Sequence, residues 1–269
     1  MPDRRAPGEG GCRWCGAPTS LAFTLTVLRK FEVNYLQCSG CSSLQTQRPY
    51  WLSDAYDKNL ARLDTGAAQR NISNLAASYL VARIFELRNV LDFGGGDGLL
   101  CRLLRDYGLN CFVRDKYASA TYALAFTEPD FARPDLMLAY EVLEHLVEPR
   151  TETRDLFAEK PKVVLASTSL YEGQARDWWY LAPETGQHVF FYSAGAMRQM
   201  GQLYGYEVGI YGTYVLFVRK DCASGVGRVL AAVALNKLVV RLMSAFMRLL
   251  PTKGVWADFE RVSAMERKL

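Results

Sequence analysis

Short apolar runs alternate with helical apolar patterns through the middle of this chain. Residues 90–93 form an apolar run that ends in the glycine-rich segment 94–98, and residues 99–104 then begin an apolar helical face. Three more segments that read as strands follow at 109–117, 134–146 and 161–168. A strand, a glycine turn and a helix in this order predict an α/β fold with a doubly wound, Rossmann-like parallel sheet.

The glycines of the 94–98 turn stand at alternate positions. Glycine lets the backbone turn tightly and approach a ligand where any Cβ would clash. The dinucleotide fingerprint would need a sixth-position glycine counted from Gly94, but Leu99 stands there, so a nicotinamide or flavin site is disfavoured. The pattern that remains is Asp92-x-Gly94-x-Gly96-x-Gly98.

This pattern and the segments after it resemble the class I S-adenosylmethionine-dependent methyltransferases over residues 90–168. The second strand ends in Asp115, 17 residues after Gly98, where the family places a carboxylate on the ribose hydroxyls. The fourth strand ends in Glu141, in the family's acidic exit loop. The resemblance implies S-adenosylmethionine as cofactor and methyl transfer as activity. It also implies six cofactor-binding residues: Asp92, Gly94, Gly96, Gly98, Asp115 and Glu141.

Four of the seven cysteines form two pairs, Cys12-x-x-Cys15 and Cys38-x-x-Cys41, with 22 residues between the pairs. Two such turns can direct four thiolates at one ion and complete the tetrahedral shell that zinc prefers, with no open position. We therefore expect a structural zinc site. Disulfides are the competing interpretation, which a reducing compartment disfavours. The three unpaired cysteines are expected to be small buried apolar residues: Cys101, Cys111 and Cys222.

Composition and charge fit an enzyme of ordinary size. The 269 residues are 50% hydrophobic, and the net charge of +4 comes from basic residues scattered among 28 acidic ones. Because long basic runs are missing, nucleic acid is not an expected partner. The first eleven residues contain no apolar segment of the secretory type, so we expect a cytoplasmic location.

Both histidines of the chain are candidates for the catalytic base. Transfer of a methyl group to a hydroxyl requires removal of the hydroxyl proton, and imidazole can accept it at neutral pH. His145 follows Glu141-Val-Leu-Glu144 at the end of the fourth strand, where a structural hydrogen bond would explain it equally well. His188 lies in a polar loop between aromatic clusters, and we favour it as the base.

The segment around His188 is rich in aromatic residues. Trp178 and Trp179 could form a stacking platform for a ring-shaped acceptor, with Glu184 and Gln187 as polar contacts at its rim. With the cysteine module, this segment is similar to bacterial sugar methyltransferases, which implies a sugar or glycan acceptor and a role in glycan biosynthesis. The chain lacks the additional C-terminal domain of the longer C-methyltransferases, so we expect O-methylation.

Residues 226–250 carry four charges, all basic, and end at Pro251. They predict one amphipathic helix with a basic stripe and a broad apolar face. Two central cations argue against a membrane span. Peripheral contact with an anionic membrane, at its inner face, and self-association both remain open.

The pattern divides the chain into three parts. We expect a zinc-ribbon-like module at 1–50, the methyltransferase domain at 51–222, entered through one or two helices within 60–87, and a C-terminal helical extension at 223–269. Two alternative functions are a zinc-ribbon adaptor with an inactive methyltransferase-like domain and a methyltransferase acting on RNA or protein. The intact glycine loop and acidic residues argue against the adaptor, and the weak basic clustering argues against RNA.

Overall fold

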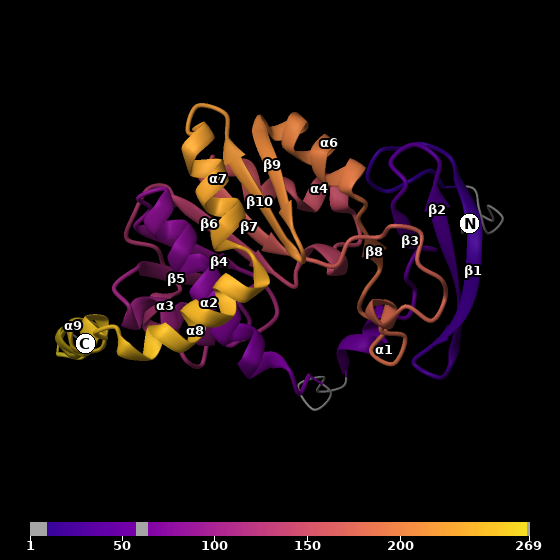
Figure 1. Cartoon of the computed structure of the whole chain (residues 1–269). Helices are drawn as coiled ribbons and strands as arrows, with labels where there is room; N and C mark the ends of the chain where they lie inside the picture. Colours follow the sequence, from indigo (N-terminus) through magenta and orange to yellow (C-terminus); the bar gives the residue numbers. More distant parts are fainter. Residues whose placement is uncertain (1–9, 58–63, 268–269) are drawn as a thin grey trace.

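The computed structural model describes residues 10–57 and 64–267, and the first residues of the helical pattern predicted from residue 60 lie outside this part. A six-stranded sheet of order β5-β4-β6-β7-β10-β9 forms its centre (Figure 1). Pairs β5/β4, β4/β6 and β6/β7 are parallel, and β10 is antiparallel to both neighbours. The strands are β4 (Asn89–Phe93), β5 (Asn110–Arg114), β6 (Leu136–Tyr140), β7 (Val163–Ser167), β9 (Tyr206–Tyr211) and β10 (Tyr214–Arg219). The α/β class is confirmed, with a mixed rather than wholly parallel sheet.

The strand order places the predicted ligand loops together. The chain passes from β4 outward to β5 and then returns to β6 on the other side of β4. Open α/β sheets bind ligands at such a reversal, outside the carboxyl ends of the strands. In this chain the glycine loop follows the carboxyl end of β4, and the acidic loop follows the carboxyl end of β6.

Helices cover both faces of this sheet (Figure 1). The core strands are almost wholly buried, because residues of β6 and β7 are apolar on both faces. The helices before the C-terminal part are α1 (Leu52–Asp57), α2 (Ala67–Ile84), α3 (Leu99–Asp106), α4 (Pro149–Glu152), α5 (Arg154–Ala158) and α6 (Ala194–Tyr204). Short 3-10 turns are η2 (Leu124–Phe126), η3 (Leu143–His145) and η4 (Trp179–Leu181).

A second, antiparallel sheet contains the N-terminal strands. Its order is β1 (Thr19–Val27), β2 (Phe31–Cys38), β3 (Leu44–Thr46) and β8 (Phe190–Phe191). The last strand comes from the segment just after His188, with Phe191 opposite Leu44 and Phe190 opposite Gln45. The sheet thus unites the N-terminal module with a segment nearly 150 residues away, and a boundary at residue 50 remains a prediction.

The single helix predicted over 226–250 is wrong. The structure has α7 (Gly225–Ala234) and α8 (Lys237–Phe246), followed by η5 (Met247–Leu249), with a bend of 75° between α7 and the second helical segment. Asn236 stands at the break, and its side chain accepts a hydrogen bond from Leu238 N, which caps α8. The break lets both helices pack on α2, as the buried Leu235 and Val240 show.

The chain then forms α9 (Lys253–Glu266), which lies on α3. Asp258 of α9 accepts hydrogen bonds from Arg105 and Arg102 of α3, with contacts of 2.6 Å to each guanidinium. Since Arg105 and Asp258 are largely buried, this ion pair anchors the C-terminal helix.

Candidate active site and metal centre

The loop after β4 requires glycine for two reasons. Gly94, Gly96 and Gly98 have positive φ values of 68°, 58° and 80°. A Cβ at Gly94 would lie 2.6 Å from Val142, and one at Gly98 would lie 2.8 Å from Ala123. At Gly96 a Cβ would meet nothing within 4 Å, so this part of the loop is open to a ligand.

Asp92 lies beneath this loop with its carboxylate buried, and Oδ2 has no hydrogen-bond partner among the described residues. Burial raises the pKa of Asp92 to about 7, and the charges of Asp115 and Asp97 add to the rise. A buried carboxylate without a partner is costly, and a cationic ligand group would relieve that cost. S-Adenosylmethionine carries an ammonium group and a sulfonium, so the residues present fit this cofactor.

Asp115 joins the glycine loop to the loop after β5. One carboxylate oxygen accepts a hydrogen bond from Gly96 N at 3.0 Å, and the other accepts from Tyr117 N and Ala118 N at 2.7 and 2.8 Å. A carboxylate has about four acceptor positions, so one remains for a ligand hydroxyl. Its contact with a ribose stays a prediction.

Glu141 follows β6 at the same edge of the sheet and adopts a left-handed backbone conformation, with φ of 53°. The Ser167 hydroxyl donates a hydrogen bond to the Glu141 carboxylate at 2.7 Å. The Glu141 N–H in turn donates to the Ser167 hydroxyl oxygen at 3.1 Å. Burial raises the pKa of Glu141, and the nearby charge of Glu144 adds to this rise. A left-handed conformation at a residue other than glycine is strained, and such strain is typical of functional sites.

The two histidines, 43 positions apart in the sequence, are neighbours in the fold. The ring centroids of His145 and His188 lie 5.0 Å apart, nearly perpendicular. Each Nδ1 faces a backbone carbonyl, that of Gln187 for His145 (3.2 Å) and that of Tyr180 for His188 (2.7 Å). Because a carbonyl oxygen only accepts, each Nδ1 must carry the proton, and each neutral ring keeps a lone pair on Nε2.

Their surroundings distinguish the two histidines. Burial lowers the pKa of His145 to about 3, so this ring stays neutral at physiological pH. Glu144 presents a fully buried carboxylate to both rings, and neither of its oxygens has a hydrogen-bond partner in the described part of the chain. One donor atom from each of the three side chains lies within 4.8 Å of the others. Sequence reasoning assigned no role to Glu144, because the sequence alone does not reveal its burial.

Arg13, between the first two cysteines, fixes the backbone beside both histidines. Its guanidinium donates hydrogen bonds to the carbonyls of Val147 (2.9 Å), Thr46 (3.2 Å) and Val189. Val147 lies two positions after His145, and Val189 directly follows His188. Sequence reasoning missed this residue, because its partners lie 33, 134 and 176 positions away and no local pattern indicates them.

The four paired cysteines come together as predicted. The sulfurs of Cys12 and Cys41 lie 3.7 Å apart, those of Cys15 and Cys38 lie 3.4 Å apart, and all four fit within 4.8 Å. A tetrahedron with zinc–sulfur bonds of about 2.3 Å has sulfur separations of about 3.8 Å. All four are free cysteines, with sulfur separations far above a disulfide bond of about 2.05 Å. This donor set fits a structural zinc ion.

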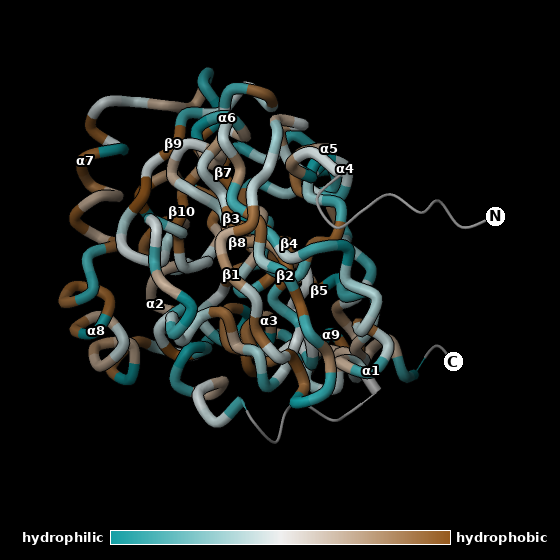
Figure 2. The backbone as a smooth tube through the Cα atoms, turned by 90° about the vertical axis from the view of Figure 1, so that its right-hand side faces the viewer, coloured by the Kyte–Doolittle hydropathy of each residue, from teal (hydrophilic) through white to brown (hydrophobic). Residues whose placement is uncertain are grey.

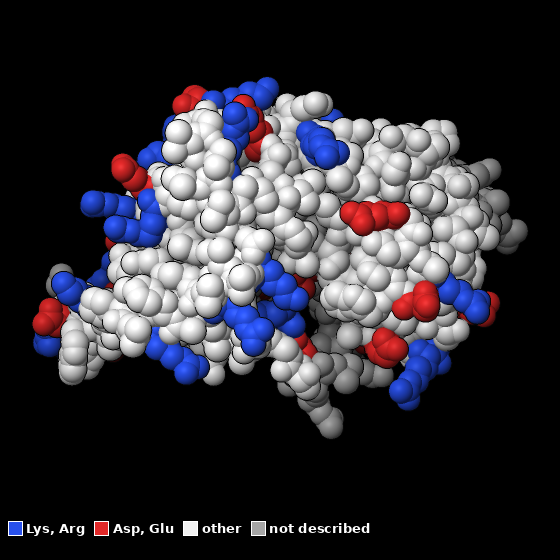
Figure 3. All heavy atoms as spheres, viewed as in Figure 1, with Lys and Arg blue, Asp and Glu red and all other residues white. Residues whose placement is uncertain are grey.

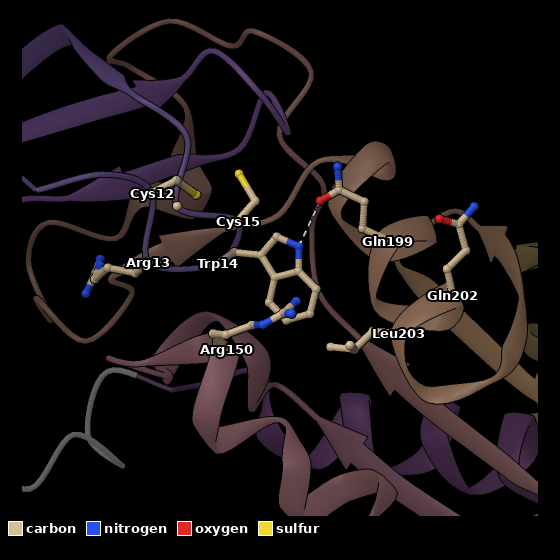
Figure 4. A pocket seen from close by; sticks show the side chains of 9 residues that line it. Cys12, Arg13, Trp14, Cys15, Arg150, Gln199, Gln202 and Leu203 are labelled. Atoms are coloured by element: carbon tan, nitrogen blue, oxygen red, sulfur yellow. Dashed lines mark hydrogen bonds between the residues drawn. The ribbon is translucent and has the colours of Figure 1, made fainter.

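Backbone donors and a hollow surround this cluster. The N–H groups of Gly40 and Cys41 donate to the Cys38 sulfur, a contact that stabilises a thiolate. In Figure 4, Cys12 and Cys15 lie beside Trp14, whose Nε1 donates to Gln199 Oε1 at 3.1 Å across a surface hollow. The hollow borders the metal centre and not the glycine loop. Of the other cysteines, two are buried as expected and one is half-buried: Cys101, Cys111 and Cys222.

The predicted acceptor residues occupy different environments. Trp178 is half-buried against Tyr180 and Phe191 in the core of the N-terminal module. Trp179 is 75% exposed. Glu184 is exposed, and Gln187 is half-buried and donates to Ala55 O at 3.3 Å. Trp179 and Glu184 are thus accessible to an acceptor from solvent, whereas Trp178 has a packing role. That these three residues and Gln187 contact an acceptor stays a prediction.

Comparison with known proteins gives a family for the chain. A family model described as a methyltransferase domain matches residues 44–209. No curated protein matches significantly. Among solved structures, magnesium protoporphyrin IX methyltransferase from Synechocystis, solved with bound SAH, is 16% identical, with a TM-score of 0.44 over 64% of this chain and 98% of that one. An O-methyltransferase family protein from Burkholderia thailandensis is 15% identical, with a TM-score of 0.47 over 65% and 63%.

Proposed function

This chain belongs to the methyltransferase domain family and is an S-adenosylmethionine-dependent methyltransferase; on that premise, we propose that it methylates a hydroxyl group of a sugar, in nucleotide-linked or glycan form. The observation that carries the proposal is the His188 ring, which lies beside the buried Glu144 carboxylate after β6 and whose Nε2 has no hydrogen-bond partner in the described part of the chain. A sugar hydroxyl is a poor nucleophile while it keeps its proton, so its methylation gains most from a positioned base.

His188 is the better base of the two histidines. With its Nδ1–H held by Tyr180 O, its Nε2 lone pair accepts the hydroxyl proton as the oxygen forms its new bond to carbon. The carboxylate of Glu144 then stabilises the imidazolium through a short charge–charge distance in a buried environment. His145 is too weak a base for this role, because burial lowers its pKa to about 3.

The cofactor would be held by the loop after β4. The backbone at Gly96 leaves room for it, Asp92 offers an unpaired buried oxygen to a cationic group, and Asp115 offers one acceptor position to a hydroxyl. Glu141 borders the same space after β6. When bound, S-adenosylmethionine supplies an electrophilic methyl group on a sulfonium. The protein contributes alignment, which can lower the barrier by several kcal/mol.

The acceptor would enter beside η4. Trp179 exposes an aromatic face there, and Glu184 lies near it in the sequence as an exposed polar group. Flat aromatic faces and polar side chains together suit a sugar ring. This arrangement supports the sugar assignment more than an assignment to RNA, because the chain has no long basic runs.

The zinc ion in the proposal has a structural role. Four cysteine sulfurs leave no open coordination position, so the ion would not contact the acceptor. It would hold the knuckle that contains Arg13, and Arg13 holds the backbone beside both histidines. Metal and proposed base are thereby linked through one side chain.

Transfer of label from methyl-labelled S-adenosylmethionine to a panel of acceptors tests the proposal. The panel contains nucleotide sugars, glycan extract, RNA and protein, and the methylated product is identified by mass and linkage analysis. We expect an O-methyl sugar. Label on RNA or protein alone would contradict the acceptor class, and bound cofactor without transfer to any acceptor would favour the inactive adaptor.

A further inference from the structure

Two C-terminal helices each expose an apolar stripe on the side away from the protein. Among the described residues, no single helix is long and apolar enough to cross a membrane; α7 with residues 237–249 meets the length and composition only as a pair bent by 75°. Both helices pack on α2 (Figure 1), so their opposite sides point out of the molecule. In Figure 2 these two helices form the outer edge and are largely brown, the colour of hydrophobic residues.

The stripe on α7 follows helical spacing. It consists of Val226, Val229, Leu230 and Val233, each at least 49% exposed. The buried residues of the same helix, Ala231 among them, lie about 120° further round the helix. The helix is therefore apolar on two sides, and within residues 10–57 and 64–267 only the side with Ala231 packs against other elements.

The stripe on α8 and η5 continues this pattern. It consists of Leu238, Leu242, Phe246 and Leu249, each more than half exposed. At about 100° per residue these four positions lie within roughly 80° of one another on the helix circumference. The two stripes together expose eight apolar side chains, and a continuous apolar patch of this kind on a globular protein marks a contact surface.

Basic residues border the stripe on one side. Lys237, Arg241 and Arg248 are all exposed and fall within roughly 40° of one another, next to the apolar stripe. No acidic residue occurs between Asp221 and Asp258, whereas five basic residues do. In Figure 3 the surface over α7 and α8 is mostly uncharged, with Lys and Arg side chains at its borders.

We propose that this face of α7 and α8 docks onto an anionic lipid bilayer, with the apolar stripes among the acyl chains and the basic row on the lipid headgroups. An apolar stripe flanked by Lys and Arg is the arrangement of helices that lie in the membrane interface. A second copy of the chain suits the face less well, because pairing would bring the two basic rows together without acidic partners. Docking leaves the contacts of both helices with α2 intact.

Vesicle sedimentation of the full chain tests this proposal without any methyl acceptor, so its outcome is independent of the proposed function. The vesicles are phosphatidylcholine alone or phosphatidylcholine mixed with phosphatidylglycerol. We expect binding to the anionic vesicles that weakens with salt. Replacing Lys237, Arg241 and Arg248 together by Gln should weaken binding about 100-fold, since each cation near an anionic surface contributes about fivefold.

Apolar variants complete the test. Leu242→Glu with Phe246→Glu should weaken binding by at least about tenfold. Leu21→Glu, equally exposed on β1 at the opposite end of the molecule, is the matched control and should bind like the wild type. Wild-type protein that stays in the supernatant would overturn the proposal, as would a wild-type dimer that Leu242→Glu converts to a monomer. Should the apolar variant not fold, the Gln variant decides alone.

Discussion

Replacement of Arg13 by Gln should weaken both the stability of the protein and its catalysis. The guanidinium donates to three backbone carbonyls, and charged hydrogen bonds contribute about 1.5–3 kcal/mol each, or roughly 4–9 kcal/mol in all. Burial lowers the pKa of Arg13 to about 10, which corresponds to a desolvation cost of about 3 kcal/mol that the variant avoids. The expected net loss is about 1–6 kcal/mol, or a fall in Tm of roughly 2–24 °C at about 2–4 °C per kcal/mol.

Urea unfolding and thermal melts measure this loss, and methyl transfer well below the Tm measures the catalytic effect. Arg48→Gln is the matched control, because that arginine is highly exposed and its ion pair with Glu148 should contribute less than about 1 kcal/mol. We expect Arg13→Gln to keep its affinity for S-adenosylhomocysteine but to lose turnover. Stability and turnover equal to those of Arg48→Gln would refute the idea that Arg13 positions the histidines.

Three further predictions concern other sites. Metal analysis should find about one zinc per chain, Cys38→Ser should lose it together with several kcal/mol of stability, and metal-free protein of unchanged Tm would contradict this. Asp258→Asn should lower the free energy of unfolding in urea by about 3–5 kcal/mol at pH 7. Because the ion pair lowers the pKa of Asp258, this difference from wild type should shrink as pH falls below about 4, and a difference that does not change with pH would contradict the role of the ion pair. Asp92→Asn should stabilise the ligand-free protein by about 1–4 kcal/mol at pH 8 but not near pH 4, because a pKa raised to about 7 makes ionisation of Asp92 costly in the folded state. The same variant should bind S-adenosylhomocysteine more weakly in calorimetry, and unchanged binding would contradict the role of Asp92 in holding the cofactor.

Features that depend on neighbouring residues could be predicted from the sequence. The strands at 89–93, 110–114, 136–140 and 163–167 and the glycine loop follow from local apolar runs and from backbone conformations that only glycine adopts easily. The cysteine cluster follows from the spacing of its two pairs, which brings four sulfurs within 4.8 Å. Each of these signals lies within a few residues of the feature that it predicts.

Features that depend on long-range contacts could not be predicted. The strand at 190–191 joins the N-terminal sheet through backbone pairing with 44–45, which leaves no trace in either segment alone. Arg13 and Glu144 are important because of what surrounds them, and burial is a property of the fold. The helix break at Asn236 has a weak local signal, because Asn is a common N-cap residue. The apolar pattern continues past Asn236, however, and predicts one continuous helix.

The pH dependence of single-turnover methyl transfer tests most directly whether His188 takes the acceptor proton. For the wild type we predict an acidic limb that reports the titration of a histidine. His188→Ala should bind S-adenosylhomocysteine normally, lose about 10²–10⁴ in rate and lose the acidic limb, whereas His145→Ala should keep the limb. Near-normal turnover in His188→Ala with an unchanged pH profile would contradict the account, and alignment alone would then carry the reaction.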